Sequence, residues 1–276
     1  MKTERQLALR VYQDFLGEHP VFTLDDLAQV AGGKEPRRTA RERVKYYVET
    51  GRLRRLAREL YAVVPQNSKP GAFSPDPFLV GAALRDDAVF SYHSALELLG
   101  AGHSDWNVCT AFTQKRPTVV RWGSHTVRML AAPTRALGDE WRSLGVREVR
   151  HGGRTLRTTG PERTLVEGFR QPVWAGGLAE LVESAAGFAS LNMDLLRSVL
   201  AAYQQRSLWA AVGWFLERHA RTFYASGDLL EEFASHRPKS KHYLPRGMRG
   251  GVFVSRWNLM LPPELLRGGD VHEPLE

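Results

Sequence analysis

A proline-rich segment, PQNSKPGAFSPDP at residues 65–77, constrains the fold of this 276-residue chain more than any other feature. Proline lacks a backbone N–H and fixes φ, so a segment with four prolines cannot continue a helix or a central strand. We therefore predict an extended linker over residues 65–77. It separates an N-terminal domain, residues 1–64, from a larger domain, residues 78–276, and the chain is long enough for a core in each.

The N-terminal domain begins with two predicted helices. Apolar residues at helical spacing form the buried stripe of the first helix, and they are Leu7, Val11, Phe15 and Leu16. The second helix is expected to open at Thr23, because Asp26 stands three residues later as its capping-box partner. Gly32 and Gly33 are expected to end it.

A third helix and a hairpin complete the N-terminal domain. The helix is predicted from about Pro36, which is favoured in a first turn, to Gly51, which is favoured just past a helix end. Two short strands, LRRLA and LYAVV, come next and turn at Arg58-Glu59. This order is that of a winged helix-turn-helix, in which the third helix enters the DNA major groove and the ribbon lies along the backbone.

The stretch KEPRRTARERVKYYVETGRLRRLARELY carries ten Lys or Arg residues against four acidic ones. On the third helix one side is apolar and the opposite side is basic, as a recognition helix requires. The residues predicted to contact DNA are Arg37, Arg38, Thr39, Arg41, Lys45, Arg52, Arg54, Arg55 and Arg58. The alternative is a solvated helix, because Arg38–Glu42 and Lys45–Glu49 are also i,i+4 ion pairs.

The larger domain is predicted to be α+β, with a mixed β-sheet and a helical layer. Strands are predicted at residues 106–113, 118–122, 126–130, 146–150 and 154–159. Helices are predicted at residues 78–84 and 94–99, and from Pro161 to about Ser235. Residues 251–262 are expected to form a late strand that returns to the same sheet.

Composition excludes several classes of function. The 38 Lys and Arg against 30 Asp and Glu give a net charge of +8, which favours an anionic partner. Cys109 is the single cysteine, so neither an intramolecular disulfide nor a Cys-rich zinc site is possible. The histidines lack metal-ligand spacing, His103-Ser104-Asp105 is interpreted as a polar turn, and no GxxxxGK[ST] loop occurs. We therefore expect no catalytic residues, no metal, no cofactor and no enzyme activity.

The chain is expected to be cytoplasmic. The first residues, MKTERQLALRVYQDF, lack the apolar core of a signal peptide. No run of about 18 uninterrupted apolar residues occurs, so no membrane partner is expected.

Several patches together resemble the AbiEi-type antitoxins of bacterial abortive-infection systems. They are GRLRRLARELYAV, SYHSALELLGAG, TGPERTLVEGFRQP with AGGLAEL, and FVSRWNLMLP, and they occur in the family's order over nearly the whole chain. One departure lies at the hairpin turn, where the family has Arg-Gly-Leu-Tyr and this chain has Glu59 in place of the glycine. Glycine permits positive φ, which glutamate tolerates poorly, so the turn conformation stays open.

The resemblance implies a winged-helix repressor domain that binds inverted repeats in its own promoter. It also implies a C-terminal domain that counteracts a nucleotidyltransferase-like toxin, as in type IV toxin–antitoxin pairs that act in phage defence. Two alternatives stay open. One is a ligand-sensing transcription factor without a toxin, and the other is a nucleic-acid-processing enzyme that uses a winged helix to position its substrate.

Overall fold

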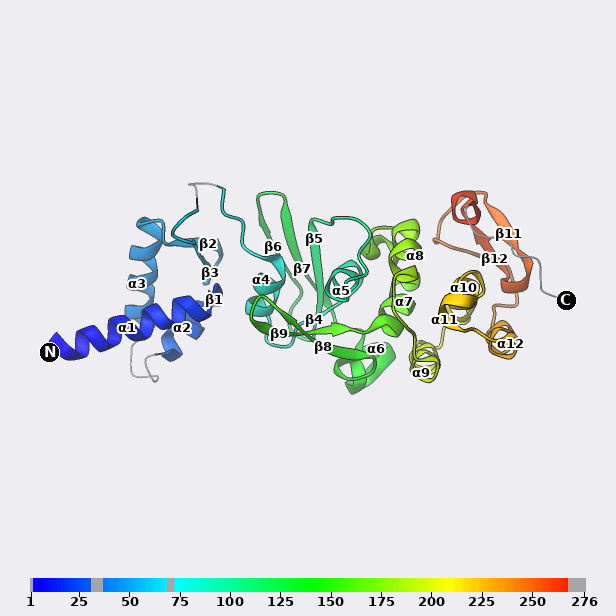
Figure 1. The fold of residues 1–276 in the computed structure, drawn as a ribbon, viewed down its shortest axis with the longest axis horizontal. Helices are drawn as coiled ribbons and strands as arrows, with labels where there is room; N and C mark the ends of the chain where they lie inside the picture. The colour runs from blue at the N-terminus through cyan, green and yellow to red at the C-terminus, as the bar shows by residue number, and fades with distance from the viewer. Residues whose placement is uncertain (1, 31–36, 69–71, 268–276) are drawn as a thin grey trace. The chain divides into compact units, whose positions relative to one another are not determined.

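The computed structural model describes residues 2–30, 37–68 and 72–267 (Figure 1). Contacts between Cα atoms divide the chain into two compact units. Unit 1 contains residues 1–88, 107–131 and 150–156, and unit 2 contains residues 89–106, 132–149 and 157–276. Both units contain helices and strands, so the chain is mixed α and β, as the sequence predicts.

Unit 1 begins with a helical region that carries a small antiparallel sheet (Figure 1). The helices are α1 (Lys2–Glu18), α2 (Leu24–Val30) and α3 (Arg37–Glu49), and the strands are β1 (Val21–Thr23), β2 (Leu53–Ala57) and β3 (Leu60–Val63). The strand order is β1–β3–β2. The sequence predicts the helices and the β2–β3 hairpin but not β1, a strand too short to show an alternating pattern.

The capping box at the start of α2 is confirmed. The Thr23 backbone N–H donates to the Asp26 carboxylate at 2.7 Å, and the Asp26 N–H donates to the Thr23 hydroxyl at 3.2 Å. These bonds satisfy backbone donors that a helix end leaves unpaired. The stop signal at Gly32-Gly33 and the start signal at Pro36 lie outside the described residues.

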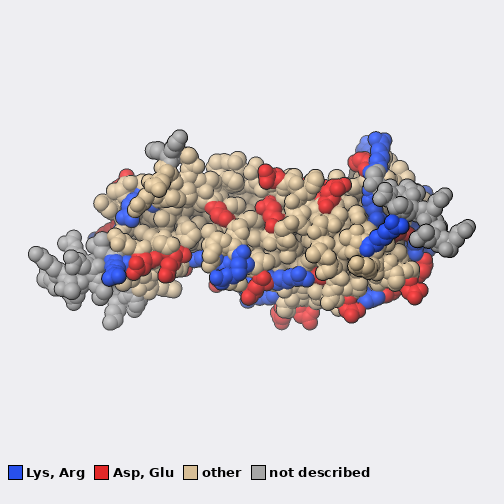
Figure 2. Space-filling model, in the orientation of Figure 1, with Lys and Arg blue, Asp and Glu red and all other residues tan. Residues whose placement is uncertain are grey.

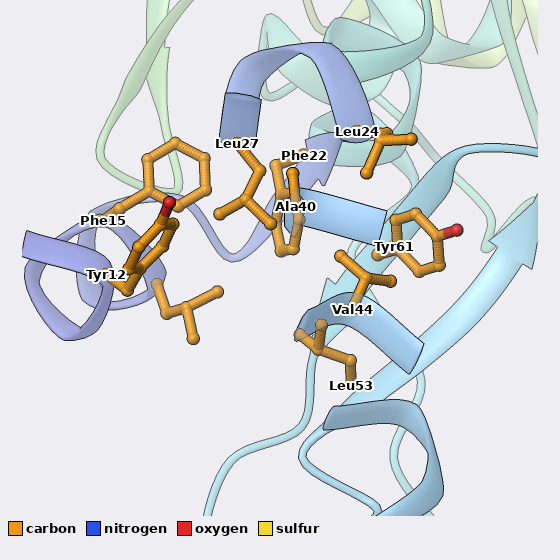
Figure 3. Close-up of a cluster of buried hydrophobic side chains, with 10 residues drawn as sticks. Tyr12, Phe15, Phe22, Leu24, Leu27, Ala40, Val44, Leu53 and Tyr61 are labelled. Atoms are coloured by element: carbon orange, nitrogen blue, oxygen red, sulfur yellow. The ribbon is translucent and has the colours of Figure 1, made fainter. Parts of the chain in front are cut away.

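A core holds the first 64 residues together (Figure 3). Its ten buried side chains are Tyr12, Phe15, Leu16, Phe22, Leu24, Leu27, Ala40, Val44, Leu53 and Tyr61. Phe22 of β1 is the register partner of Tyr61 of β3, so the sheet packs directly into this core. All ten residues come from α1, β1, α2, α3 and the hairpin, so this core cluster lies within the first 64 residues.

One expectation for α1 is wrong. Val11 is 37% exposed, whereas Tyr12, one position later, is 1% exposed and takes its place in the core. Tyr12 stands four residues before the buried Leu16, and residues at i,i+4 spacing lie on the same face of a helix, so Tyr12 belongs to the same apolar stripe. The Arg43 guanidinium lies 4.1 Å from the Tyr12 ring centroid, which gives this aromatic ring a cationic neighbour that Val11 could not use. Leu7 lies outside the residues whose side chains are described.

The rest of unit 1 contains α4 (Pro77–Leu84) and three neighbouring strands of a larger, six-stranded sheet. Its strands are β5 (Val108–Thr113), β6 (Thr118–Trp122) and β7 (His125–Ala131), in the order β6–β7–β5. β5 runs parallel to β7, and β6 runs antiparallel to it. The β-branched runs therefore form a mixed sheet, as predicted, and α4 contacts both β7 and β1.

The proline-rich segment is hydrogen-bonded within unit 1. Arg54 of β2 donates to the Phe73 carbonyl at 2.6 Å, and the Trp122 indole N–H of β6 donates to the Ser74 hydroxyl at 3.1 Å. Asp76 caps α4 and contacts His151 at 2.7 Å. The two compact units do not divide at residues 65–77, because unit 1 continues through this segment to residue 88. The two domains and the linker that the sequence predicts stay a prediction about independent folding.

Unit 2 is largely helical. It contains α5 (His93–Leu98), α6 (Thr134–Leu137), α7 (Pro161–Arg170), α8 (Leu178–Ala186), α9 (Met193–Tyr203), α10 (Arg206–Arg218), α11 (Ala220–Phe223) and α12 (Gly227–Ser235). β4 (Val89–Phe90) pairs in parallel with β9 (Arg154–Thr159), which comes after β8 (Val146–His151). Helix α7 is buried from Pro161 to Phe169 and packs against α8, α9 and α10, so it forms the centre of the unit.

The last strands form a separate sheet, which corrects the expectation of one late strand that rejoins the larger sheet. β10 (His242–Tyr243), β11 (Val252–Val254) and β12 (Leu259–Leu261) take the order β10–β12–β11. A 3₁₀ turn at Ser255–Trp257 and a left-handed Asn258, with φ of 51°, split residues 251–262 into two antiparallel strands. Asparagine tolerates that conformation, so the apolar run folds back on itself.

Candidate nucleic-acid interface

A groove in unit 1 runs between helix α3 and the β2–β3 hairpin. Its volume is about 550 Å³, and it is lined by Arg41, Val44, Lys45, Val48, Glu49, Arg55, Arg58, Glu59 and Tyr61. Four of these residues are cations that the sequence predicts to contact DNA. The helix supplies two of them and the hairpin supplies the other two, so both walls of the groove carry positive charge.

Helix α3 presents its basic side because its other side is fixed in the core. Ala40 and Val44 are buried in the cluster of Figure 3, and Tyr47 packs against that cluster. Arg41 and Lys45 are exposed on the same helix. The two faces agree with the amphipathic pattern that the sequence predicts.

Ion pairs along α3 occupy two of its predicted contacts. Arg38 contacts Glu42 at 3.2 Å, and Lys45 contacts Glu49 at 3.8 Å, both at i,i+4 spacing. All four side chains are well exposed, so each pair contributes little stability, roughly 0–1 kcal/mol. Either ion pair can therefore open at small cost.

Glu59 joins the hairpin turn to the start of α3. Its carboxylate accepts a hydrogen bond from Arg37 at 2.7 Å and a second from Arg41 at 3.3 Å. Arg37 also contacts Asp25 of α2 at 3.1 Å. The sequence does not identify Asp25 and Glu59 as partners of Arg37, because only the packing of α2, α3 and the hairpin brings these three residues together.

The turn at Glu59 has the left-handed conformation, with φ of 58°. Glutamate disfavours this region, and the surrounding backbone holds it there. The Leu24 N–H donates to the Glu59 carbonyl at 2.9 Å, and the next residue, Leu60, is buried and pairs with Thr23. The question that the sequence leaves open is thus answered: the turn keeps positive φ without glycine.

The other residues predicted to contact DNA differ in whether their side chains are exposed or already bound within the protein. Arg55 and Arg58 are exposed on the hairpin, and Arg55 donates to the nearby Ala57 carbonyl at 3.3 Å. The Arg52 guanidinium lies 5.2 Å from the Tyr47 ring centroid, and Thr39 is half-buried in the first turn of α3. Arg54 is half-buried and bound to the Phe73 carbonyl, so its guanidinium serves the fold of unit 1.

Figure 2 shows one face of the molecule, on which positive and negative side chains are intermixed over a mostly uncharged surface. On this face, therefore, the net charge of +8 is not gathered into one large patch.

Unit 2 contains a polar cluster that sequence reasoning missed. The His93 ring is fully buried, with Nδ1 2.8 Å from Glu97 and Nε2 3.2 Å from Glu180. Ser104 donates to Glu180 through both its backbone N–H, at 3.1 Å, and its hydroxyl, at 2.8 Å. The signal available in the sequence was that His93 and Glu180 each lie in one of the patches on which the resemblance to the AbiEi-type antitoxins rests.

Hydrogen bonds dominate the ionisation of this cluster. Burial raises the pKa of Glu180, but hydrogen bonds from Ser184, Ser104 and His93 outweigh it and lower the pKa to about 2. The Ser104 hydroxyl is bound to this carboxylate, so His103-Ser104-Asp105 forms a polar turn anchored to α8. Glu180 is thus held as an anion that ties the 102–106 segment in place.

A second buried network is centred on α7. Arg163 and Glu167 are fully buried and in contact at 2.8 Å, and the Tyr203 hydroxyl donates to Glu167 at 2.5 Å. Arg163 also donates to the Trp141 carbonyl at 2.7 Å. Burial and the Glu167 charge raise the pKa of Tyr203 far above its usual range, so Tyr203 stays a neutral donor. These groups fix α7 within unit 2.

Two kinds of site are absent from residues 2–30, 37–68 and 72–267. No three His, Cys, Asp or Glu residues lie where they could jointly hold a metal ion. None of the helices there combines the length and the apolar character needed to span a membrane.

Comparisons with known proteins give a likeness in fold. No family model and no curated protein matches the sequence. Among solved structures, the chain is similar to the crystal structure of the RV2827C protein from Mycobacterium tuberculosis. The TM-score is 0.59 at 18% identity, over 92% of this chain and 90% of that chain. The two proteins therefore share an overall fold along nearly their whole length.

Proposed function

We propose that this protein is a DNA-binding transcriptional autorepressor and antitoxin of a bacterial abortive-infection pair. The groove between α3 and the β2–β3 hairpin carries the DNA-binding part, because Arg41 and Lys45 on one wall face Arg55 and Arg58 on the other. The element order α1, β1, α2, α3, β2, β3 supports a winged helix-turn-helix. In that arrangement α3 enters the major groove and the hairpin lies against phosphates.

The two walls then have different tasks. Cations on α3 would reach base edges, which carry sequence discrimination. Cations on the hairpin would contact phosphates, which supply affinity without sequence preference. Inverted repeats at the promoter would bring two copies of the chain to one operator, as the resemblance implies.

The antitoxin part rests on the resemblance to the AbiEi family. The partner would be a nucleotidyltransferase-like toxin in the same cytoplasm, counteracted by the residues after the proline-rich segment. No catalytic residue is proposed in this chain.

A fluorescence anisotropy titration at several salt concentrations tests the DNA-binding part. About six phosphate contacts give a slope of log K against log[salt] near −5, at roughly −0.9 for each phosphate. Arg55→Ala should weaken promoter and random DNA alike and reduce the slope by about one. Arg41→Ala should cost about 1–3 kcal/mol on the promoter and less on random DNA.

Arg221→Ala is the matched control for that titration. Arg221 is exposed on α11 in unit 2, so its loss changes net charge equally but removes no cation from the groove. If Arg41→Ala and Arg55→Ala bind promoter DNA no differently from Arg221→Ala, the groove is only a solvated charged surface. The DNA-binding proposal then fails.

A hollow in unit 2 favours a second candidate, a ligand-sensing transcription factor without a toxin. Its volume is about 220 Å³, and its charged or ionisable lining residues are Arg170, His242 and Arg246, above an apolar floor that includes Phe169 and Leu244. No described acidic residue lines it, so a small organic anion fits its chemistry. Benzoate that changes promoter affinity in the same titration would support this candidate over the antitoxin.

A further inference from the structure

The Glu59 carboxylate lies where two arginines of the groove region converge. Arg37 donates to one of its oxygens at 2.7 Å and Arg41 to the other at 3.3 Å. A carboxylate and a phosphate each present a pair of acceptor oxygens to a guanidinium, and arginine binds both in the same manner. We propose that Glu59 occupies the position of a DNA phosphate in the free protein and competes with DNA for Arg37 and Arg41. This inference rests on the proposed DNA-binding function.

The surroundings favour an anion at this position. Arg37 is the first residue of α3, a helix of 13 residues, whose N-terminal end carries the positive end of the helix dipole. Glu59 is itself one of the groove-lining residues, and its side chain is only 30% exposed. A DNA phosphate that approaches the start of α3 therefore meets a carboxylate already bound there.

The backbone fixes the competitor in place. Glu59 has φ of 58°, a conformation in which a glutamate is strained, and the Leu24 N–H bond to its carbonyl holds it there. The carboxylate therefore starts from a defined point between α2 and α3 instead of from a free loop. DNA can displace the side chain by rotation about its own bonds while the turn stays unchanged.

The charge balance gives the consequence for affinity. Arg37 and Arg41 contribute two positive charges, and in the free protein Glu59 pairs with both of them while Asp25 also pairs with Arg37. Without the Glu59 carboxylate, Asp25 still pairs with Arg37 but Arg41 is released, so about one more phosphate can be neutralised and the salt slope steepens by roughly 0.9. The contacts involved are ion pairs to phosphate, so promoter and random DNA should gain alike.

The test compares Glu59→Gln and Glu59→Asn with the full-length wild type by anisotropy at several salt concentrations. Gln keeps the size of the side chain and removes its charge, whereas Asn removes the charge and tolerates positive φ. Both variants should bind promoter and random DNA about threefold to thirtyfold more tightly at low salt, because two exposed ion pairs no longer oppose binding. The gain should shrink as salt rises.

Glu42→Gln is the charge-matched control. Glu42 lies on α3, the helix that carries Arg37 and Arg41, and it pairs with Arg38, but it does not line the groove. It should give a smaller gain than either Glu59 variant, and thermal melts should confirm that all the proteins are folded. Equal gains for Glu59→Gln and Glu42→Gln would reduce the effect to net charge and overturn the competition.

Weaker binding by both Glu59 variants would also overturn it, because Glu59 would then help to form the DNA contact. If the wild type and every variant fail to bind any DNA at low salt, the proposed function itself fails. If the wild type binds DNA but neither Glu59 variant changes its affinity, only the competition is overturned and the proposed function stands.

Discussion

At the scale of single residues, Glu180 shows how a carboxylate can stabilise the fold through its charge. It accepts hydrogen bonds from His93, Ser104 and Ser184, and these bonds favour the ionised form. Their sum outweighs burial and lowers the pKa from 4.5 to about 2. A depressed carboxyl pKa contributes stability above the unfolded-state pKa, and this contribution is lost as pH falls through the folded-state value.

We predict that Glu180→Gln destabilises the protein in a pH-dependent way. At neutral pH the free energy of unfolding should fall by about 3 kcal/mol, since the pKa falls from 4.5 to about 2 and each pKa unit corresponds to about 1.4 kcal/mol. The difference from wild type should narrow between pH 4.5 and about 2, where the wild-type carboxylate takes up its proton. Urea unfolding followed by tryptophan fluorescence across that range measures it. A difference that stays constant with pH would show that the charge is not responsible.

At the scale of elements, α10 is fixed against the turn that precedes β12. Gly213 of α10 lies beneath the Trp257 ring, and a Cβ atom built at Gly213 would lie 2.1 Å from a ring carbon. Trp257 is fully buried, and its indole N–H donates to Glu217 of the same helix at 2.6 Å. The glycine is therefore required by a close approach and not by backbone flexibility.

We predict that Gly213→Ala lowers the free energy of unfolding by about 1–3 kcal/mol, although alanine is the better helix former. The ring cannot move without loss of its packing and of the bond to Glu217. Gly227→Ala is the control, because Gly227 is also in a helix and a Cβ atom there meets nothing within 4 Å. Thermal melts of the two variants should separate clearly. A Gly213→Ala protein as stable as Gly227→Ala would contradict the contact.

At the scale of the whole molecule, two features bear on whether the first 64 residues fold alone. All ten residues of their core cluster lie between residues 12 and 61, which favours independence. Arg54, however, donates to Phe73, and α4 contacts β1, so the region is also bound to the segment from Phe73 to the end of α4. A hydrophobic core of its own allows a region to fold alone, and the contacts with residues 73–84 add to the stability of this region.

We predict that a cut near Ser68 leaves two folded fragments. The N-terminal fragment should bind DNA weakly, because it keeps the groove but loses the bond of Arg54 and the contacts of α4. The C-terminal fragment should counteract the toxin on its own. Circular dichroism and co-expression of each fragment with the toxin check these outcomes. Rescue by the N-terminal fragment, or unfolding of both fragments, would refute the division.

Sequence alone determined the elements whose signals are local. The strands at residues 118–122 and 154–159, the helix that starts at Pro161 and the capping box of Thr23 with Asp26 all match the structure. Capping, turn chemistry and periodicity act over about one helical turn or a few strand residues, so they can be read along the chain. The basic face of α3 is local for the same reason.

The tertiary structure alone decided which charged groups far apart in the sequence meet. Glu59 reaches Arg37 across 22 positions, and His93 reaches Glu180 across 87. It also decided that Arg54 binds the Phe73 carbonyl and that residues 251–262 join β10 instead of the larger sheet. Contacts at such separations depend on how elements pack, and local patterns do not specify which elements pack together. The sequence thus determined which cations are present and which pair within one helix, and the fold determined which of them are bound by a carboxylate distant in the sequence.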